Sequence, residues 1–273
     1  SIQYTIERKG RSYTKTAVYF LGRAGKERVR LSDEHTGYRW LPLPDALQVL
    51  PHASLRAVVR QAALFLKDAA LFAVEPVTEA AAESHLLTLP GGTDRMLGHV
   101  RGGAHIAKTI AAALAERGKR IDVQATGVGG LLHDAGRFLG EHDNHAIAGL
   151  EHLRATDLAP YGYACVSHFT KGAFSSELLG AGLTAESIAA YASQIDLSTL
   201  TWEEHCIALA DACMKHDTPV TPHERFQDLR SRYDAKALID LQERRTLAIR
   251  RTIAASLGHD PLALVGLGDV KLR

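Results

Sequence analysis

His133 and Asp134 stand side by side at the end of an apolar run that finishes with Leu131 and Leu132. Neighbouring side chains on a helix point about 100° apart, so this imidazole and this carboxylate can converge on one metal ion from the same rim. A carboxylate buried at this place without a partner would cost several kcal/mol. The alternative is an ordinary helix end at the surface, and the pair by itself does not decide between the two interpretations.

Other metal-competent side chains lie in similar apolar, helix-like surroundings. His99 precedes the helical run of residues 104–117, and Asp211 lies inside the apolar run of residues 207–212, where an unpaired carboxylate would again be costly. Among the histidines between Asp134 and Asp211, His145 and His168 are the two further candidates. The sequence therefore offers six candidate metal ligands: His99, His133, Asp134, His145, His168 and Asp211.

Four other residues compete for these positions: His105, His142, His152 and Asp196. His142 is three residues from His145 and could reach the same site, since residues three apart share a helix face. Asp196 competes with Asp211, but it precedes Leu197 and Ser198 and is typical of a helix cap or turn. The histidine at position 105 lies six residues beyond His99 and is expected on a different face.

The candidates follow one another as a His, a His-Asp pair, two further His and an Asp in an Ala-Asp step, over roughly residues 96–216. This order resembles the HD superfamily of metal-dependent phosphohydrolases. The two intermediate histidines fit its dinuclear branch, which includes bacterial symmetrical dinucleoside tetraphosphate hydrolases. Residues 144–149 resemble the His-Ala-x-x-Gly step of that family, which favours His145 over its competitors.

Four imidazoles and two carboxylates suit borderline divalent ions such as iron, manganese, zinc or nickel. The resemblance implies two such ions. The first would be bound by His99, His133, Asp134 and Asp211. The second would be bound by His145 and His168, with Asp134 bridging the two.

The expected catalytic residues are Asp134, Arg137 and Lys171. A pair of divalent ions would activate a water molecule for attack on phosphorus and would stabilise charge on the phosphoryl oxygens. Arg137 and Lys171 are expected to contact the phosphates that are not attacked, the first as a fork and the second as a point charge. Both could instead be exposed surface cations.

The expected activity is hydrolysis of phosphoester or phosphoanhydride bonds in a nucleotide. Dinucleoside polyphosphates lead among the substrates by resemblance, because composition and spacing say nothing about the base or the number of phosphates. Two alternatives remain: an enzyme of another specificity, such as a deoxynucleotide phosphatase or a cyclic-nucleotide phosphodiesterase, and a non-catalytic, metal-bound nucleotide sensor.

Composition excludes some partners. A formal net charge of +1 argues against non-specific nucleic-acid binding, which needs a strongly basic face. The sequence has no apolar stretch long enough to span a membrane and no signal peptide. Its three cysteines form no CxxC pair, which favours a reducing cytoplasm. A homodimer remains possible from the sequence.

We expect a mostly α fold in which a small N-terminal α+β segment precedes an all-helical domain. Residues 1–70 form the first segment, 71–95 a linker, 96–260 the helical HD-type domain and 261–273 a C-terminal tail. Strands are predicted over 12–22 and 29–31, and a helix over 55–66. Three glycines at positions 127, 129 and 130 indicate close helix packing within an expected helix over 123–139.

Residues 15–21 and 32–41 resemble the C-terminal half of a Nudix hydrolase of the branch that cleaves dinucleoside tetraphosphates. The Glu-rich Nudix box is absent from the sequence, so we expect no Nudix catalysis. Glu34, Tyr38 and Trp40 could hold a nucleotide base, but an aromatic core and rim of a small domain is favoured. Near the other end, Arg244, Arg245, Arg250 and Arg251 are expected to form a solvated face.

Overall fold

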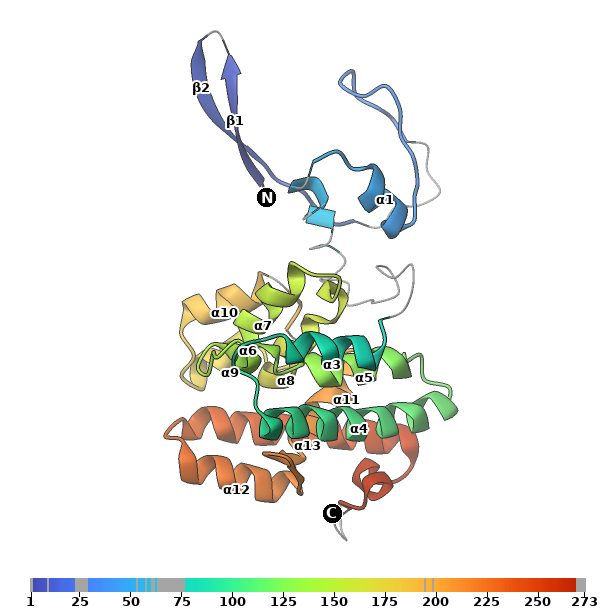
Figure 1. Ribbon diagram of the computed structural model, residues 1–273, viewed down its shortest axis with the longest axis vertical. Coiled ribbons are helices and arrows are strands. Elements are labelled where there is room, and N and C mark those ends of the chain that lie inside the picture. The colour runs from blue at the N-terminus through green and yellow to red at the C-terminus, as the bar shows by residue number, and fades with distance from the viewer. Residues whose placement is uncertain are drawn as a thin grey trace.

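The computed structural model describes residues 2–8, 10–22, 29–52, 54–56, 58–59, 62, 77–193, 195–197 and 199–268. These residues are mostly helical, with a small two-stranded sheet near the N-terminus, which confirms the expected class at this level (Figure 1). The α-helices are α1 (Leu43–Val49), α3 (Glu79–Leu87), α4 (Asp94–Glu116), α5 (Val123–Leu132), α6 (Ala135–Phe138), α7 (His145–Arg154), α8 (Tyr163–Thr170), α9 (Ser175–Gly180), α10 (Ala185–Ala192), α11 (Trp202–Asp211), α12 (Pro222–Arg232) and α13 (Lys236–Leu257). Two 3-10 helices are η2 (Ala159–Tyr161) and η3 (Pro261–Val265).

The N-terminal sheet is a hairpin of β1 (Ile2–Arg8) and β2 (Arg11–Ala17). The strands pair antiparallel, and Gly10 in the turn has a φ of +68°, which a glycine adopts without strain. The strand predicted over 12–22 thus ends at Ala17, and residues 29–31 form no strand. The partner of β2 is β1, which precedes it in the chain and was not predicted.

The aromatic pair of the N-terminal segment is not in a core. Tyr38 and Trp40 are 55% and 67% exposed, and their rings meet edge to face with centroids 6.5 Å apart. The expectation of an aromatic core is therefore wrong for these two residues. Most of the helix predicted over 55–66, and residues 71–76 of the predicted linker, lie outside the described residues.

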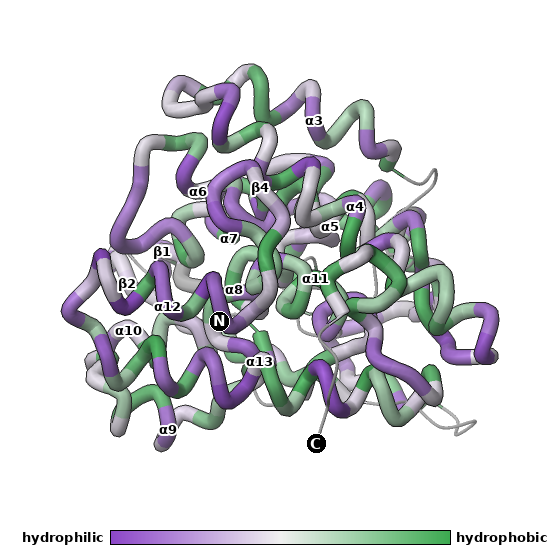
Figure 2. Tube along the Cα trace, turned by 90° about the horizontal axis from the view of Figure 1, so that it is seen from below, coloured by the Kyte–Doolittle hydropathy of each residue, from purple (hydrophilic) through white to green (hydrophobic). Residues whose placement is uncertain are grey.

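The helical part is built around α11. This helix packs against α4, α5, α8 and α13, and Figure 2 shows it in the middle of the molecule when seen from below. Its residues from Cys206 to Ala210 are all buried. Thr201 caps the N-terminus of α11, and the Glu204 carboxylate reaches back to the Thr201 amide in a capping box. Among the described helices, none is both long enough and apolar enough to cross a membrane.

Helices α4 and α5 approach each other at a glycine. A Cβ added to Gly130 would lie 2.7 Å from the Cα of Ala104, and one added to Gly129 would lie 2.8 Å from the Ile207 side chain. The prediction of close packing at these glycines is confirmed. This approach brings together the rings of His99, near the start of α4, and His133, at the end of α5. Their centroids are 5.4 Å apart.

The helix predicted over 123–139 is interrupted. Helix α5 ends at Leu132, α6 begins at Ala135, and Asp134 between them has φ −103° and ψ 21°. A second departure is a short hairpin of β3 (Met214–Lys215) and β4 (Thr218–Pro219), so the part expected to be all-helical contains two short strands. His216 in its turn has a φ of +58°.

The helical core extends beyond the boundaries that we expected. Helix α3 falls inside the predicted linker, yet its Ala82 and Leu86 are fully buried against the core. In the predicted tail, Leu262 of η3 is also fully buried. Both segments carry apolar residues that the core covers, so described helical packing runs from 79 to 265.

Two of the four arginines expected on a solvated face are engaged elsewhere. Arg250 is 8% exposed, and its Nε and Nη2 donate to the two carboxylate oxygens of Asp260 at 2.9 and 2.6 Å. The guanidinium of Arg245 donates to Glu177. The expectation is therefore wrong for these two, because α13 packs between α9 and η3 instead of turning this side to solvent.

Candidate metal centre

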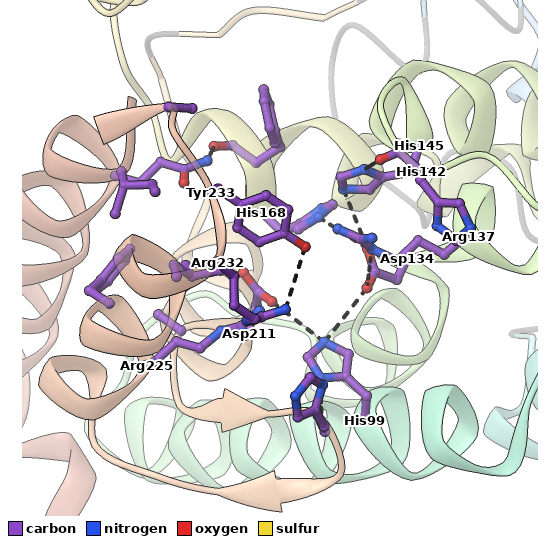
Figure 3. A pocket seen from close by; sticks show the side chains of 18 of the residues that line it. His99, Asp134, Arg137, His142, His145, His168, Asp211, Arg225, Arg232 and Tyr233 are labelled. Carbon is purple, nitrogen blue, oxygen red and sulfur yellow. Dashed lines mark hydrogen bonds and ion pairs between the residues drawn. The ribbon is translucent and has the colours of Figure 1, made fainter. Parts of the chain in front are cut away.

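All six candidate ligands meet in one place, and Figure 3 labels five of them, all except His133. They come from five places in the fold: α4, the break between α5 and α6, the first residue of α7, α8, and the last residue of α11. In chain order they are His99, His133, Asp134, His145, His168 and Asp211. Except for Asp211, which is half-buried, all are buried.

Asp134 is at the middle of the group, and its two carboxylate oxygens face different histidines. Its Oδ2 lies 3.6 Å from Nε2 of His99 and 3.9 Å from Nε2 of His133. Its Oδ1 lies 3.5 Å from Nε2 of His145 and 3.4 Å from Nε2 of His168. The break before α6 makes this orientation possible, because the backbone of Asp134 lies between two helices and does not have helical dihedral angles.

Asp211 adds a second carboxylate beside the first pair. Its Oδ1 lies 3.6 Å from Nε2 of His99 and 3.8 Å from Nε2 of His133. These distances are too long for hydrogen bonds, but ligands at about 2.1 Å from one ion in tetrahedral geometry lie about 3.4 Å apart. The Nε2 of His133 is buried and has no hydrogen-bond partner in the described structure. These buried residues could hold a metal ion.

Each of the four histidines is oriented by a backbone carbonyl. The Nδ1–H of each ring donates to a carbonyl oxygen, which leaves Nε2 with a free lone pair toward the centre. The four bonds are His99 to His216 (2.7 Å), His133 to Gly130 (2.7 Å), His145 to His142 (3.0 Å) and His168 to Ala164 (3.0 Å). This arrangement is typical of histidines that bind metals through Nε2.

Both carboxylates are held in the charged form. Burial raises the pKa of Asp134, but Arg137 and the surrounding histidines lower it more strongly, so the net pKa lies well below the usual range. For Asp211, burial is likewise outweighed, above all by Lys171 and His99. The site therefore keeps two anionic oxygen donors at neutral pH.

Two of the histidines are held neutral by burial. It lowers the pKa of His133 and of His145 to about 4, despite the opposing charge of Asp134. For His99, burial also lowers the pKa, but the carboxylates of Asp211 and Asp134 raise it more. Neutral imidazoles are the form that binds metals.

We predict that the metal-depleted protein loses stability as pH falls from about 6.5 toward 4. In that window the unfolded chain takes up protons at His133 and His145, whereas the folded protein does not, so each contributes up to about 1.4 kcal/mol per pH unit. His99, whose folded pKa is raised, adds stability as pH falls toward 6.5 and does not change the slope below that pH. Urea unfolding at several pH values measures the slope for the wild type and for His145→Gln, in which it should be smaller. An equal slope in the two proteins would contradict the prediction; His105→Gln, at an exposed position, is the control.

Lys171 is buried and contacts Asp211, which the sequence did not suggest. It ends α8 in the left-handed conformation, with a φ of +51°, and is 3% exposed. Its ammonium group donates to the Ala208 carbonyl at 2.9 Å and to Oδ2 of Asp211 at 3.2 Å. Because Oδ2 is held in this way, Oδ1 of Asp211 is left to face the histidines.

Arg137 contacts the central carboxylate from the other side. Its Nε lies 3.2 Å from Oδ1 and 3.1 Å from Oδ2 of Asp134, one turn earlier in the chain. Its side chain is 32% exposed and lines the same pocket as the candidate ligands. It is thus placed both to position Asp134 and to meet a bound anion.

The competing residues are not among the six. His142 is exposed at the pocket and contributes its carbonyl to His145, whereas Nε2 of His152 lies 2.9 Å from Nε2 of His85, in a separate pair. His105 is exposed on α4, and Asp196 does not line the pocket. The preference for His145 and Asp211 therefore agrees with their position in the structure.

The centre opens into a pocket of about 500 Å³. One wall comes from α12 and α13 and includes apolar side chains that the sequence had not indicated: Phe226, Leu229, Tyr233, Leu238 and Ile239. The same wall includes Arg225 and Arg232, which are seven residues apart and so share a helix face. That spacing is the signal by which they could have been found.

Comparison with known proteins gives no relative. No protein-family model matches the chain, and no match was found among curated proteins or among solved structures.

Proposed function

We propose that this protein is a metal-dependent hydrolase of phosphoester or phosphoanhydride bonds in nucleotides, with dinucleoside polyphosphates as the leading substrates. The observation that carries the proposal is the position of Asp134, which offers one oxygen to each of two histidine pairs. A carboxylate shared in this way is what a bridging ligand of two cations requires. The order of the six residues in the chain, which resembles that of the dinuclear HD phosphohydrolases, supports the same interpretation.

The donor set fits a pair of divalent ions. His99, His133, Asp134 and Asp211 would hold the first, and His145, His168 and Asp134 the second. Nitrogen-rich sites of this kind suit iron, manganese, zinc or nickel better than calcium or magnesium. Bound there, such ions would supply Lewis acidity toward phosphoryl oxygens and would lower the pKa of water.

The protein's own residues would then prepare and bind the substrate. Lys171 fixes the rotamer of Asp211, and Arg137 fixes Asp134 while it remains partly exposed to an incoming phosphate. The apolar wall from α12 and α13 favours an organic phosphate over a purely inorganic one, because it offers contact area to a nucleoside. Tyr233 on this wall and Phe169 of α8, which also lines the pocket, present rings on which a base can stack.

The proposal is tested by metal analysis and a nucleotide panel. We expect about two transition-metal ions per chain in the purified protein. We also expect chelator-sensitive hydrolysis, restored by manganese, iron, cobalt, nickel or zinc, of at least one member of a panel of dinucleoside polyphosphates, deoxynucleotides and cyclic nucleotides. Product analysis identifies the bond that is cleaved. If no nucleotide is hydrolysed with any of these metals, the proposed activity is wrong, and tight binding of one nucleotide would instead favour a sensor.

A further inference from the structure

Three arginines, Arg95, Arg225 and Arg232, line the pocket together with His216. Burial lowers the pKa of His216, the positive charges of these arginines lower it further, and Asp228 raises it. Arg95 comes from α4, and the other two lie two turns apart on α12. In Figure 3, Arg225 and Arg232 face the centre from the side opposite Arg137.

Two of these arginines are fixed from behind by Asp228. The Nε and Nη2 of Arg232 donate to its Oδ2 at 3.0 and 2.5 Å, and Nη1 of Arg225 lies 3.6 Å from the same oxygen. Lys215 also lies 3.5 Å from Asp228. Asp228 itself does not line the pocket, so a single carboxylate outside the pocket orients cations whose total charge exceeds its own.

Tyr233 completes the orientation of Arg232. The Nη1 of Arg232 lies 3.4 Å from the Tyr233 hydroxyl, and its guanidinium carbon is 5.1 Å from the centre of that ring. A guanidinium held along one edge by a carboxylate keeps N–H groups for an anion on its other edge. The side chain of Arg232 is 33% exposed, so those groups can be reached from the pocket.

The side of the pocket that carries Arg225 and Arg232 is connected to the candidate metal centre by a hydrogen bond. The carbonyl of His216, which lines the same pocket as the arginines, accepts the hydrogen bond that orients His99. Among the acidic side chains that line the described pocket, Asp143 alone stands outside the candidate ligands. The arginines thus add positive charge beside the centre, and few acidic side chains in the pocket neutralise it.

We propose that Arg225 and Arg232, with Arg95, form a binding site for the phosphate group next to the one that is attacked. That this site binds the phosphate next to the attacked one rests on the proposed hydrolytic function. That it binds an anion does not. The geometry favours substrates with linked phosphates, because a single phosphate at the metal centre would leave these guanidinium groups unused. The arginines are then specificity-determining residues for chain length.

The experiment is calorimetric titration of inorganic tripolyphosphate into the metal-depleted full-length chain. We expect the wild type to bind, and Arg225→Gln and Arg232→Gln each to lower the affinity about tenfold, as for loss of one charge-assisted hydrogen bond to an anion. Arg95→Gln, at an exposed position, should act in the same direction. Arg251→Gln removes the same charge from an exposed position of α13 and should bind like the wild type.

Thermal unfolding of each variant shows that it is folded, and Asp228 keeps Lys215 and one arginine in either single α12 variant. If the Arg225→Gln, Arg232→Gln double variant binds tripolyphosphate as tightly as the wild type, the anion site is wrong. That result leaves metal-dependent nucleotide hydrolysis untouched. Conversely, binding that depends on these arginines in a protein that hydrolyses no nucleotide would refute the proposed function and retain the site.

Discussion

Asp134→Asn should remove metal binding and nucleotide hydrolysis together. The amide that replaces the carboxylate is neutral and has one oxygen, so it cannot face both histidine pairs as the two oxygens of Asp134 do. We expect metal content to fall from about two ions per chain to less than one. We expect the rate to fall by on the order of a thousandfold or more, since a metal contributes several kcal/mol to such a transition state. Elemental analysis and the assay on the best nucleotide measure the two effects.

Single histidine variants separate the two halves of the centre. His99→Ala should lose the ion next to Asp211, and His145→Ala the ion on the other side, so each should retain about one ion. Asp143→Asn is the matched control, because it also lines the pocket but lies outside the six candidate ligands. If Asp134→Asn keeps two ions and full activity, the shared carboxylate is not a ligand and the model of the centre fails.

The candidate ligands could be chosen from the sequence because of their surroundings. Asp211 follows five buried residues of α11, and an ionised carboxylate in such a run is costly unless something compensates it. Residue type and apolar context therefore carried the information. They could not predict the distance between His99 and His133, because a simple helical hairpin would leave these two residues at unequal heights. The close approach of Gly130 to Ala104 brings the two together.

Lys171 shows where residue type was not enough. As a polar residue after His168 it was expected to meet phosphate, but its left-handed backbone ends α8 and turns the side chain toward Asp211. A positive φ at a lysine is uncommon and has no signature in the sequence. The same holds for His216, whose turn presents its carbonyl to His99.

Domain limits were harder to predict than the site. Pro90 and Gly91 read as a break, and a break does occur between α3 and α4, yet both helices belong to one core. Gly91 donates its amide to the carbonyl of Phe138, which ties this turn to the chain after the centre. Turn signals mark where a chain bends, but they do not show whether the two sides pack together.

The second pair of histidines depends on a backbone contact between α6 and α7. A Cβ added to Gly136 would lie 2.0 Å from the carbonyl oxygen of His145 and 2.7 Å from its carbonyl carbon. From the other side, a Cβ on Gly149 would lie 2.8 Å from the amide nitrogen of Gly136. Both obstacles are main chain, so no side-chain rotation relieves them, and the first residue of α7 must move if Gly136 gains a methyl group.

We therefore expect Gly136→Ala to displace His145, to lower the free energy of unfolding by about 3 kcal/mol, and to reduce hydrolysis by about a hundredfold through misplacement of the site. Urea unfolding and elemental analysis measure the outcome: about one ion should be lost while the one near His99 stays. Gly180→Ala is the control, because a Cβ there meets nothing within 4 Å. If Gly136→Ala is as stable as the wild type and keeps both ions, the contact between α6 and α7 is not what positions His145.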